Sequence, residues 1–534
     1  KLFKQMRQIF SILFLALLCK GCQSPATGEF TPKSPARVQS EIESFLSSHK
    51  WQKDERNKRP VIAVTPAEIK RLKAAWSEKA AGKEVLAKRF SMVDRAMEEP
   101  LVFPPEGGQH NQWYQCTDCQ IGLRTIDDHH HKCPQCRNVY SGFPYDNVIY
   151  SRMHSHNINV AENAAWAWAV TGDRKYAEFA ARILLGYAER YLRYPMVHAS
   201  VSDKSIDVAA EKTGKYQSAG HIKEQTLDEA NLMVPVVTAY DLIQNSGVLS
   251  RDEKENIEKN FIRAMADCIN VYKSGKSNWQ TWHNTALMYA GLVLTDRQMV
   301  EQALLDKDNG FITQMNISVM PEGMWYENSW GYHYYTLSAL THMAEAARRS
   351  GIDIYSHEML HKMYLIAFDY LMSDGSLPRF GDSVNDTPGN PAVNEMAYMA
   401  YSDDRLLFTL PSEISWDMIM SGRKADQRAS IPGTASRLIP GAGHAILATE
   451  GPGQLTAALT FGPYGGFHGH FDKLSFVFFG YGSELGVDPG RAASQAYRLP
   501  IHSEWYKATT GHNAILADGE SQKEAEGKLL SFAA

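Results

Sequence analysis

The hydrophobic pattern of the chain changes near residue 430, and this change constrains the fold more than any other feature. Between about 40 and 420, apolar side chains recur at helical spacing; Phe179, Ile183 and Tyr187 mark one such helix after a turn at 171–173. After about 432, short β-rich runs alternate with Gly- and Pro-rich turns, which is typical of an antiparallel sheet. The sequence therefore predicts an α+β multidomain protein whose helical part precedes its sheet.

Further helical runs are predicted at 226–245, 252–273, 281–294, 335–350 and 357–373. The short turns that connect them favour antiparallel helix pairs stacked in a ring or an arc. Strands are predicted at 444–449, 455–461 and 474–479. A β-sandwich needs more strands than these, so we expect either an incomplete sandwich or a truncated chain.

The N-terminus has the features of a targeting segment. It carries three basic residues, Lys1, Lys4 and Arg7. The apolar run at 9–18 is about ten residues long, which suits a signal peptide, whereas a membrane span needs about 20. We predict a signal peptide at 1–22, either simply cleaved or carrying a lipid anchor on Cys22, and then a tether at 23–40. The protein is expected in the periplasm, or at the outer membrane or cell surface as a lipoprotein.

Composition and charge exclude some functions and favour others. Hydrophobic residues make up 44% of the chain and aromatic residues 11%, enough for large buried cores. The formal net charge of −5 argues against a nucleic-acid-binding protein, because such domains are usually basic. An acidic polymer would therefore have to be attracted by a local basic cleft.

Two cysteine pairs have the spacing of a zinc ribbon: Cys116-x2-Cys119 and Cys133-x2-Cys136. Each pair can place two thiolates on one ion, and together they complete a tetrahedral site with four sulfur ligands. Such a site is closed, so we expect a structural zinc in a ribbon-like insertion at about 110–140. Disulfides are the alternative, because thiols of exported proteins tend to oxidise, and a redox role is the third reading.

Three segments combine His, Tyr, Asn and Asp at unusual density. The first two are 278–284 and 322–335. The third is made of 465–475, 487–490 and 511–513. Taken singly, a Tyr or His in an aromatic-rich helix usually serves packing, but the three segments together indicate a functional site.

At these segments the chain resembles the heparinase II/III and oligo-alginate lyase superfamily of polysaccharide lyases. One pattern is similar to the family's catalytic tyrosine segment, Tyr326-Glu327-x-Ser329-x-x-Tyr332-His333. Another is similar to its β-sandwich signature, His468-Gly469-His470-x-Asp472-x-Leu474-Ser475 followed by Asp488-Pro489-Gly490. Residues 278–284 resemble the helix that carries the family's catalytic Asn or His.

The resemblance covers about 150 to 520 and implies a particular architecture. We expect an incomplete α/α toroid over 41–430, including the ribbon-like insertion, and an antiparallel β-sandwich over 431–534. The active cleft would lie between the two. The implied reaction is β-elimination, which removes the C5 proton of a uronate and expels the sugar linked at C4; it needs a group that neutralises the carboxylate, a base and an acid.

The resemblance also implies catalytic residues. His283 would be the base or the neutralising group, and His468 a second catalytic or neutralising group. Tyr332 would be the acid at the glycosidic oxygen, with a role as the base also open. Tyr334 and Tyr335 compete for the role of Tyr332.

Four residues are implied in substrate binding: Gln280, Asn284, Arg379 and Tyr335. Arg491 and Arg498 are further basic candidates for substrate carboxylates or sulfates. Trp282 stands before His283 where several relatives have Asn, so which amide neutralises the carboxylate stays open.

A second zinc site follows from the same resemblance, with His470, Asp488 and His512 as ligands. The alternative is a hydrogen-bonded polar cluster. On a strand His468 and His470 would share one face, so they can take different roles only if Gly469 lies in a loop.

The sequence thus predicts a lyase acting on alginate, a glycosaminoglycan or a related uronate polymer. A glycoside hydrolase is the first alternative, using paired carboxylates from among Glu322, Glu327 and Asp382. A non-catalytic glycan-binding surface lipoprotein is the second.

Overall fold

The long helices are delimited by residues that cap them. The helices α6 (Tyr145–Thr171) and α7 (Arg174–Arg190) form a hairpin, because Gly172 ends α6 with a φ of 76° and the Asp173 side chain accepts the Lys175 N–H that opens α7. The helical pattern and turn predicted here are confirmed. Ile183 and Tyr187 of α7 are fully buried.

The computed structural model describes residues 30–51, 62–77, 81–197, 218–384, 387–425, 427, 429–430, 433–451 and 454–533. The predicted signal peptide at 1–22, with Cys22, lies outside these residues. Residues 33–534 form one unit. Its helix α2 (Pro35–Ser48) begins inside the predicted tether, which therefore does not extend to residue 40. No helix of the described residues is long and apolar enough to cross a membrane.

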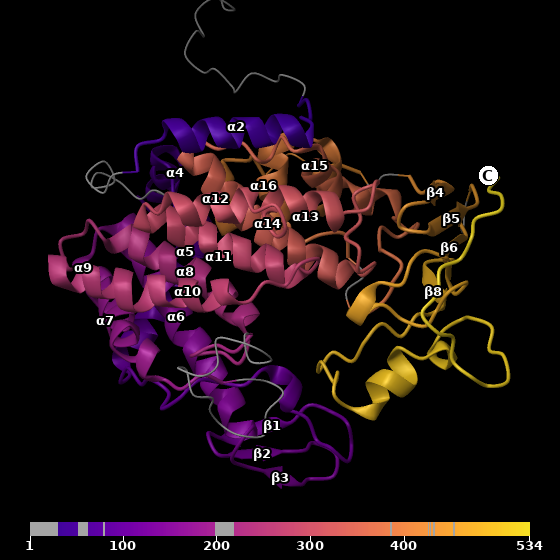
Figure 1. The fold of residues 1–534 in the computed structure, drawn as a ribbon, viewed down its shortest axis with the longest axis horizontal. Helices are drawn as coiled ribbons and strands as arrows, with labels where there is room; N and C mark the ends of the chain where they lie inside the picture. Colours follow the sequence, from indigo (N-terminus) through magenta and orange to yellow (C-terminus); the bar gives the residue numbers. More distant parts are fainter. Residues whose placement is uncertain are drawn as a thin grey trace, which may run out of the picture. The chain divides into compact units, whose positions relative to one another are not determined.

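Successive long helices pack on one another (Figure 1). α8 (Thr226–Ile243) contacts α6 and α11 (Asn278–Leu294), and α11 contacts α14 (Trp330–Ser350). The region predicted as 252–273 is α9 (Arg251–Ile257), a π-helical turn and α10 (Ala264–Val271). The remaining helices are α4 (Pro66–Ser77), α5 (Ala81–Glu98), α12 (Arg297–Leu305), α13 (Phe311–Ile317), α15 (Glu358–Leu365), α16 (Pro391–Tyr401) and α17 (Trp416–Ser421).

The helical part and the antiparallel sheet confirm the predicted α+β class. Closure of the helix pairs into an incomplete α/α toroid stays a prediction.

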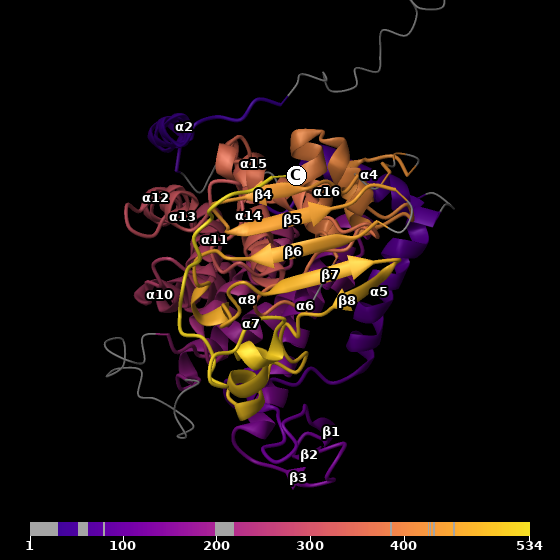
Figure 2. The same cartoon turned by 90° about the vertical axis from the view of Figure 1, so that its right-hand side faces the viewer.

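The C-terminal part contains one five-stranded antiparallel sheet (Figure 2). Its strands are β4 (Arg437–Ile439), β5 (His444–Ala448), β6 (Thr456–Thr460), β7 (Phe476–Gly480) and β8 (Ser483–Gly486), paired in sequence order. The three predicted strands correspond to β5, β6 and β7. Among the residues described after 433 there is no second sheet, so the predicted sandwich is here a single layer.

The helical part packs against this sheet. The Tyr370 OH lies 2.8 Å from His444 Nδ1 on β5, and the ring of Phe380 stacks on His444. The backbone N–H of Gly441 donates to Glu322 Oε1 at 2.9 Å. These contacts join the sheet to the helices.

A small insertion separates α5 from α6. It holds a three-stranded antiparallel sheet of β1 (Arg124–Asp127), β2 (His130–Lys132) and β3 (Val139–Tyr140). Its core includes Cys116 and Cys133 and continues into Val148 of α6. The cysteine-bearing insertion predicted at about 110–140 is therefore a β-structured unit seated on α6.

Gly490 marks a point of close contact between the two parts. Its φ is +57°, and an added Cβ would lie 1.9 Å from the Ser383 carbonyl oxygen. Gly519 also has a positive φ, +74°, but nothing lies within 4 Å of its Cβ position.

We therefore expect Gly519→Ala to lower the free energy of unfolding by about 1 kcal/mol, because alanine must adopt a left-handed conformation there. Gly490→Ala should lower it by about 3 kcal/mol, because the backbone must also move away from Ser383. Calorimetric Tm values of the two variants would test this. Equal shifts would contradict the close contact.

Candidate active site

A cavity of about 810 Å³ lies where the helical part meets the C-terminal part. The first two turns of three helices supply one wall: Asp228 and Asn231 from α8, Asn278 and Trp279 from α11, Tyr332 and Tyr335 from α14. The C-terminal part supplies His468, Arg491, Tyr497 and Arg498. Segments far apart in the sequence therefore form one polar, aromatic cavity.

Two tyrosines share a hydrogen bond in this cavity. The Tyr332 and Tyr497 hydroxyl oxygens are 2.6 Å apart. Burial, reinforced by Tyr497, raises the pKa of Tyr332 far above its usual value, and burial raises that of Tyr497 to about 12. Both phenols therefore carry their protons at neutral pH. The ring of His468 stacks on Tyr332 with centroids 3.5 Å apart.

Asp382 joins two histidines of the C-terminal part. Its Oδ2 accepts from His468 Nδ1 at 2.7 Å, and its Oδ1 accepts from His470 Nε2 at 3.0 Å. Burial alone would raise the pKa of Asp382, but these two hydrogen bonds hold it well below its usual range. A proton on Nδ1 of His468 leaves its Nε2 as the nitrogen with a lone pair.

The loop conformation separates the roles of the two histidines. Residues Gly466–His468 form a 3-10 turn, and Gly469 follows in an extended conformation outside any strand. Gly469 therefore lies in a loop, which is the condition under which His468 and His470 can take different roles. His468 lines the cavity, whereas His470 is buried beside it.

The carboxylates of the hydrolase alternative are all engaged. Glu327 accepts Asn278 Nδ2 at 2.9 and 3.2 Å and Trp325 Nε1 at 2.6 Å. Asp382 is held by two imidazoles, and Glu322 accepts a backbone N–H of the sheet. A hydrolytic pair needs one carboxyl to donate or accept a proton at the substrate, which these contacts oppose.

The structure places three predicted residues of α11 away from the cavity. His283, Gln280 and Asn284 are buried, and none of them is among the described residues that line it. Positions i, i+3 and i+4 share one helix face, and here that face points into the protein, where Asn284 Nδ2 donates to the Asn309 carbonyl. Burial lowers the pKa of His283 to about 3. The structure therefore does not bring these three residues to the wall of the cavity, and their roles at the reaction centre stay a prediction.

Of the other residues predicted in binding or catalysis, some line the cavity and others lie outside it. Tyr335 lines the cavity, and its OH accepts Asn231 Nδ2 at 2.9 Å. Arg379 lies outside it, paired with Glu484 on β8. Tyr334 packs on Trp330 and is also outside.

Several cavity residues were not predicted. Tyr497 lies between the two candidate arginines Arg491 and Arg498, but no motif marks it. Lys223 is buried, with its Nζ 2.7 Å from both Ser151 Oγ and Ser155 Oγ, and burial lowers its pKa to about 8. No periodicity or spacing reveals such a residue, because the tertiary fold alone brings it to the cavity.

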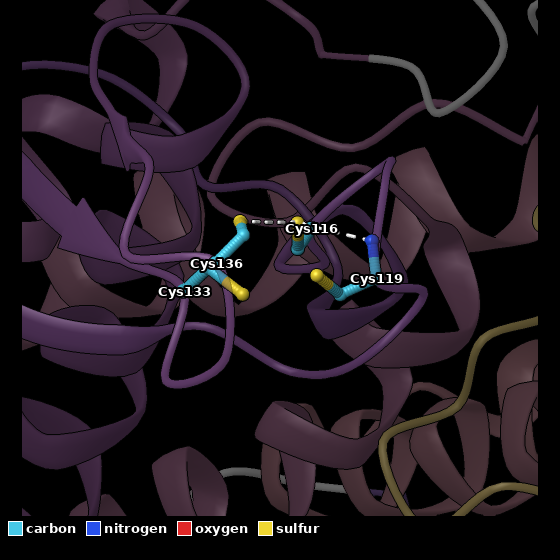
Figure 3. Close-up of side chains that lie close together, drawn as sticks. All are labelled: Cys116, Cys119, Cys133 and Cys136. Carbon is cyan, nitrogen blue, oxygen red and sulfur yellow. Dashed lines mark hydrogen bonds between the residues drawn. The ribbon is translucent and has the colours of Figure 1, made fainter.

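The four cysteines of the insertion point toward one another (Figure 3). Their sulfur atoms lie within 4.8 Å of one another, and those of Cys116 and Cys136 are 3.7 Å apart. Four sulfurs around a zinc ion at about 2.3 Å would be about 3.8 Å apart, whereas a disulfide bond is about 2.05 Å long. Backbone N–H groups of Cys119 and Gln135 donate to Cys116 and Cys133. The geometry fits a four-sulfur metal site.

A second cluster joins His470, Asp488 and His512, whose donor atoms also lie within 4.8 Å of one another. His470 Nε2 faces Asp382, while its buried Nδ1 has no hydrogen-bond partner. His512 Nε2 donates to the Tyr506 carbonyl, and its Nδ1 lies 3.0 Å from Asp488 Oδ2. Each imidazole is thus held through one nitrogen and presents the other, as metal-binding histidines do.

Two family models match the chain. A model described as alginate lyase matches residues 145–376, and one described as heparinase II/III-like, C-terminal, matches residues 431–531. Their boundary agrees with the change from helices to sheet.

The chain is 26% identical to an alginate lyase of Stenotrophomonas maltophilia over 408 residues, 69% of this chain and 52% of that protein. It is 23% identical to an exo-oligoalginate lyase of Saccharophagus degradans over 513 residues, 87% of this chain and 61% of that protein. The chain thus spans between half and two thirds of these curated relatives. Among solved structures, a heparinase III is similar in fold, with a TM-score of 0.52, 14% identity and coverage of 88% of this chain and 72% of that one.

The two contacts of Asp382 generate a prediction. An Asp382→Asn side chain has one acceptor oxygen and turns an amide N–H toward the second imidazole. We expect it to lower the free energy of unfolding by about 1–3 kcal/mol, measured by thermal unfolding. The exposed Asp308→Asn is the control, and equal Tm values for both variants would contradict the bridging role.

Proposed function

Because the chain belongs to the superfamily of heparinase II/III-like proteins and alginate lyases, we propose that it is a polysaccharide lyase that cleaves a uronate-containing polysaccharide by β-elimination. The observation that carries this proposal is the hydrogen-bonded pair Tyr332–Tyr497 beside the Asp382-oriented His468 in one cavity. These groups can take up and deliver protons within one substrate site.

The reaction needs a base at C5 of the uronate and an acid at the oxygen on C4. We assign the base to His468 Nε2, because the hydrogen bond to Asp382 directs the lone pair to that nitrogen. The C5 proton passes to Nε2 and the C4–O bond breaks as the C4=C5 double bond forms. We assign the acid to Tyr332, which protonates the departing oxygen and can be resupplied through Tyr497.

Neutralisation of the uronate carboxylate is assigned to Arg491. Its guanidinium lines the cavity, its Nη1 donates to the Ala492 carbonyl at 3.0 Å, and its buried Nε has no hydrogen-bond partner. Asn278 is less suited, because its amide N–H groups already donate to Glu327. This assignment replaces His283 in the neutralising role.

A uronate polymer agrees with the charges of the cavity. Lys223, Arg491, Arg498 and His110 line it together with the acidic residues Asp228, Glu327 and Asp382, while the chain as a whole has a net charge of −5. The cationic side chains give an anionic substrate local partners that the net charge of the protein does not provide. The names of the two curated relatives make alginate and its oligosaccharides the first substrates to test, with heparan sulfate for comparison. The same proposal places the protein outside the cytoplasm, as the apolar run at 9–18 predicts.

We also propose zinc at both clusters. The four cysteines would hold a structural ion in a closed site of four ligands, and the ion would cross-link the insertion. His470, Asp488 and His512 would hold a second ion, which fixes the His470 ring whose other nitrogen contacts Asp382. In both sites the ion supplies rigidity, and the proton transfers belong to the cavity residues.

Tyr332→Phe is expected to lower kcat by about 10²–10⁴-fold while substrate binding is retained, because only the acidic proton is lost. The matched control is Tyr334→Phe, on the same helix but outside the cavity. Unsaturated products are followed by ultraviolet absorbance and binding by calorimetry. Products without this absorbance would indicate hydrolysis, and binding without any products from the unaltered protein would indicate a glycan-binding protein.

Metal analysis tests the zinc sites separately. We expect about two zinc ions per chain, with one lost in Cys116→Ser and the other in His470→Ala. Cys268→Ala, which changes a cysteine outside both clusters, should keep both ions. Chelation should lower Tm more than it lowers turnover at low temperature. Full zinc content in Cys116→Ser, or a disulfide among the four cysteines, would contradict the first site.

A further inference from the structure

The first cysteine turn of the insertion touches the segment that carries Tyr497. Gln115 and Gln120 flank the turn Cys116–Cys119. Gln115 Nε2 donates to the Ser494 carbonyl, and Gln120 Oε1 accepts the Ile501 N–H at 2.7 Å. The two glutamines therefore hold both ends of a short segment, 494–501, with Tyr497 near its middle. Figures 1 and 2 both show the insertion beside this C-terminal segment.

This segment has little internal structure to fix its position. Residues 491–499 contain turns and no helix or strand. Its short-range hydrogen bonds, such as Leu499 N to the Ala496 carbonyl, close local turns only. The place of Tyr497 in the cavity must therefore depend on contacts with other parts of the chain.

The insertion is itself tied to the helical part. Trp113 Nε1 and Gln112 Nε2 donate to the two oxygens of buried Glu224, at 2.9 and 3.2 Å, just before α8. The Arg498 guanidinium lies 4.0 Å from the centroid of the Trp113 ring. The insertion thus connects the helical wall of the cavity to the C-terminal segment.

The geometry of the cysteine turn sets where the two glutamines point. The Cys116 N–H donates to the Ile121 carbonyl at 2.8 Å, and the Gln120 N–H donates to the Cys116 carbonyl at 2.9 Å. Gln120 has a φ of +55°, a conformation that non-glycine residues adopt only when the surrounding structure imposes it. The arrangement that directs Cys116 and Cys119 to the cluster also fixes the distance between Gln115 and Gln120.

We propose that the turn Cys116–Cys119, with Gln115 and Gln120, is a strap that positions Tyr497 against Tyr332. Gln115 and Gln120 are positioning residues, since they touch the backbone around Tyr497 and not the reacting atoms. Metal binding by the four cysteines would stiffen the strap and hold the 2.6 Å contact between the two hydroxyls. This inference rests on the proposed lyase function only for its effect on rate; the restraint on segment 494–501 is independent of it.

The same change, glutamine to glutamate, has different consequences at the two positions, because Gln115 donates its hydrogen bond and Gln120 accepts its own. Gln115→Glu removes a donor and sets a carboxylate against the Ser494 carbonyl oxygen. Gln120→Glu keeps an acceptor for the Ile501 N–H. We expect Gln115→Glu to lower kcat by about ten-fold or more with little change in KM, and Gln120→Glu to stay within about two-fold of the unaltered protein. Gln135→Glu, an exposed glutamine of the second cysteine turn, is the control.

Hydrogen–deuterium exchange gives a readout that does not need catalysis. Exchange in peptides covering 494–501 should become faster in Gln115→Glu and after removal of zinc, but not in Gln120→Glu or Gln135→Glu. Zinc content should be unchanged in all three variants. If Gln115→Glu does not fold, Gln115→Leu, which lacks both donor and charge, serves in its place.

A second arm tests whether the strap acts through Tyr497. In a Tyr497→Phe background, Gln115→Glu should cause little further loss of kcat, because the contact that it disturbs is already absent. Unchanged exchange of 494–501 in Gln115→Glu and after zinc removal would overturn the strap. If no uronate polymer is cleaved, the proposed function fails, while the exchange experiment still decides whether the strap exists.

Discussion

The buried carboxylate of Asp382 is the interaction on which the site depends. A carboxylate removed from water must be satisfied by donors, and here these are two imidazoles from a loop more than 80 residues away, at His468 and His470. The loop and the Asp382 turn also meet through their backbones, where the Asp382 N–H donates to the His468 carbonyl. Gly381 leaves the space for this approach, since an added Cβ would lie 2.7 Å from that carbonyl oxygen. These contacts fix the position of the C-terminal part against the helical part.

The two oxygens of Asp382 have different consequences. One orients His468 toward the cavity, where it stacks on Tyr332; the other orients His470 toward Asp488 and His512. A shift of His470 in the second cluster can therefore alter the position of His468 in the cavity, because both rings contact the Asp382 carboxylate. The insertion reaches the cavity from the other side, through the segment that carries Tyr497. Both proposed metal sites thus support the same pair of tyrosines without contributing an atom to it.

Local signals in the sequence predicted more of the fold than of the site. Helical spacing located α7, α8, α11 and α14, and the β-rich runs located β5 to β7, because both patterns depend on neighbouring residues. The sandwich, which was expected to be incomplete, is a single sheet among the described residues, and Tyr370 and Phe380 pack on its His444. At the site, the spacing of the cysteines predicted one cluster, and the family resemblance predicted the other, of His470, Asp488 and His512; the structure brings the residues of both together.

The sequence by itself determined the residue types, the order of helices and sheet, and the four-cysteine arrangement, since a short spacing limits how far two ligands can separate. Only the tertiary structure decided which side chains share the cavity. The rotation of α11 buries His283 and exposes Asn278 and Trp279 to the cavity, a difference that sequence patterns cannot resolve when both faces carry polar and aromatic residues. Tyr497, Arg491 and Lys223 join the site because distant backbone segments meet there, and their contacts have no counterpart in local sequence.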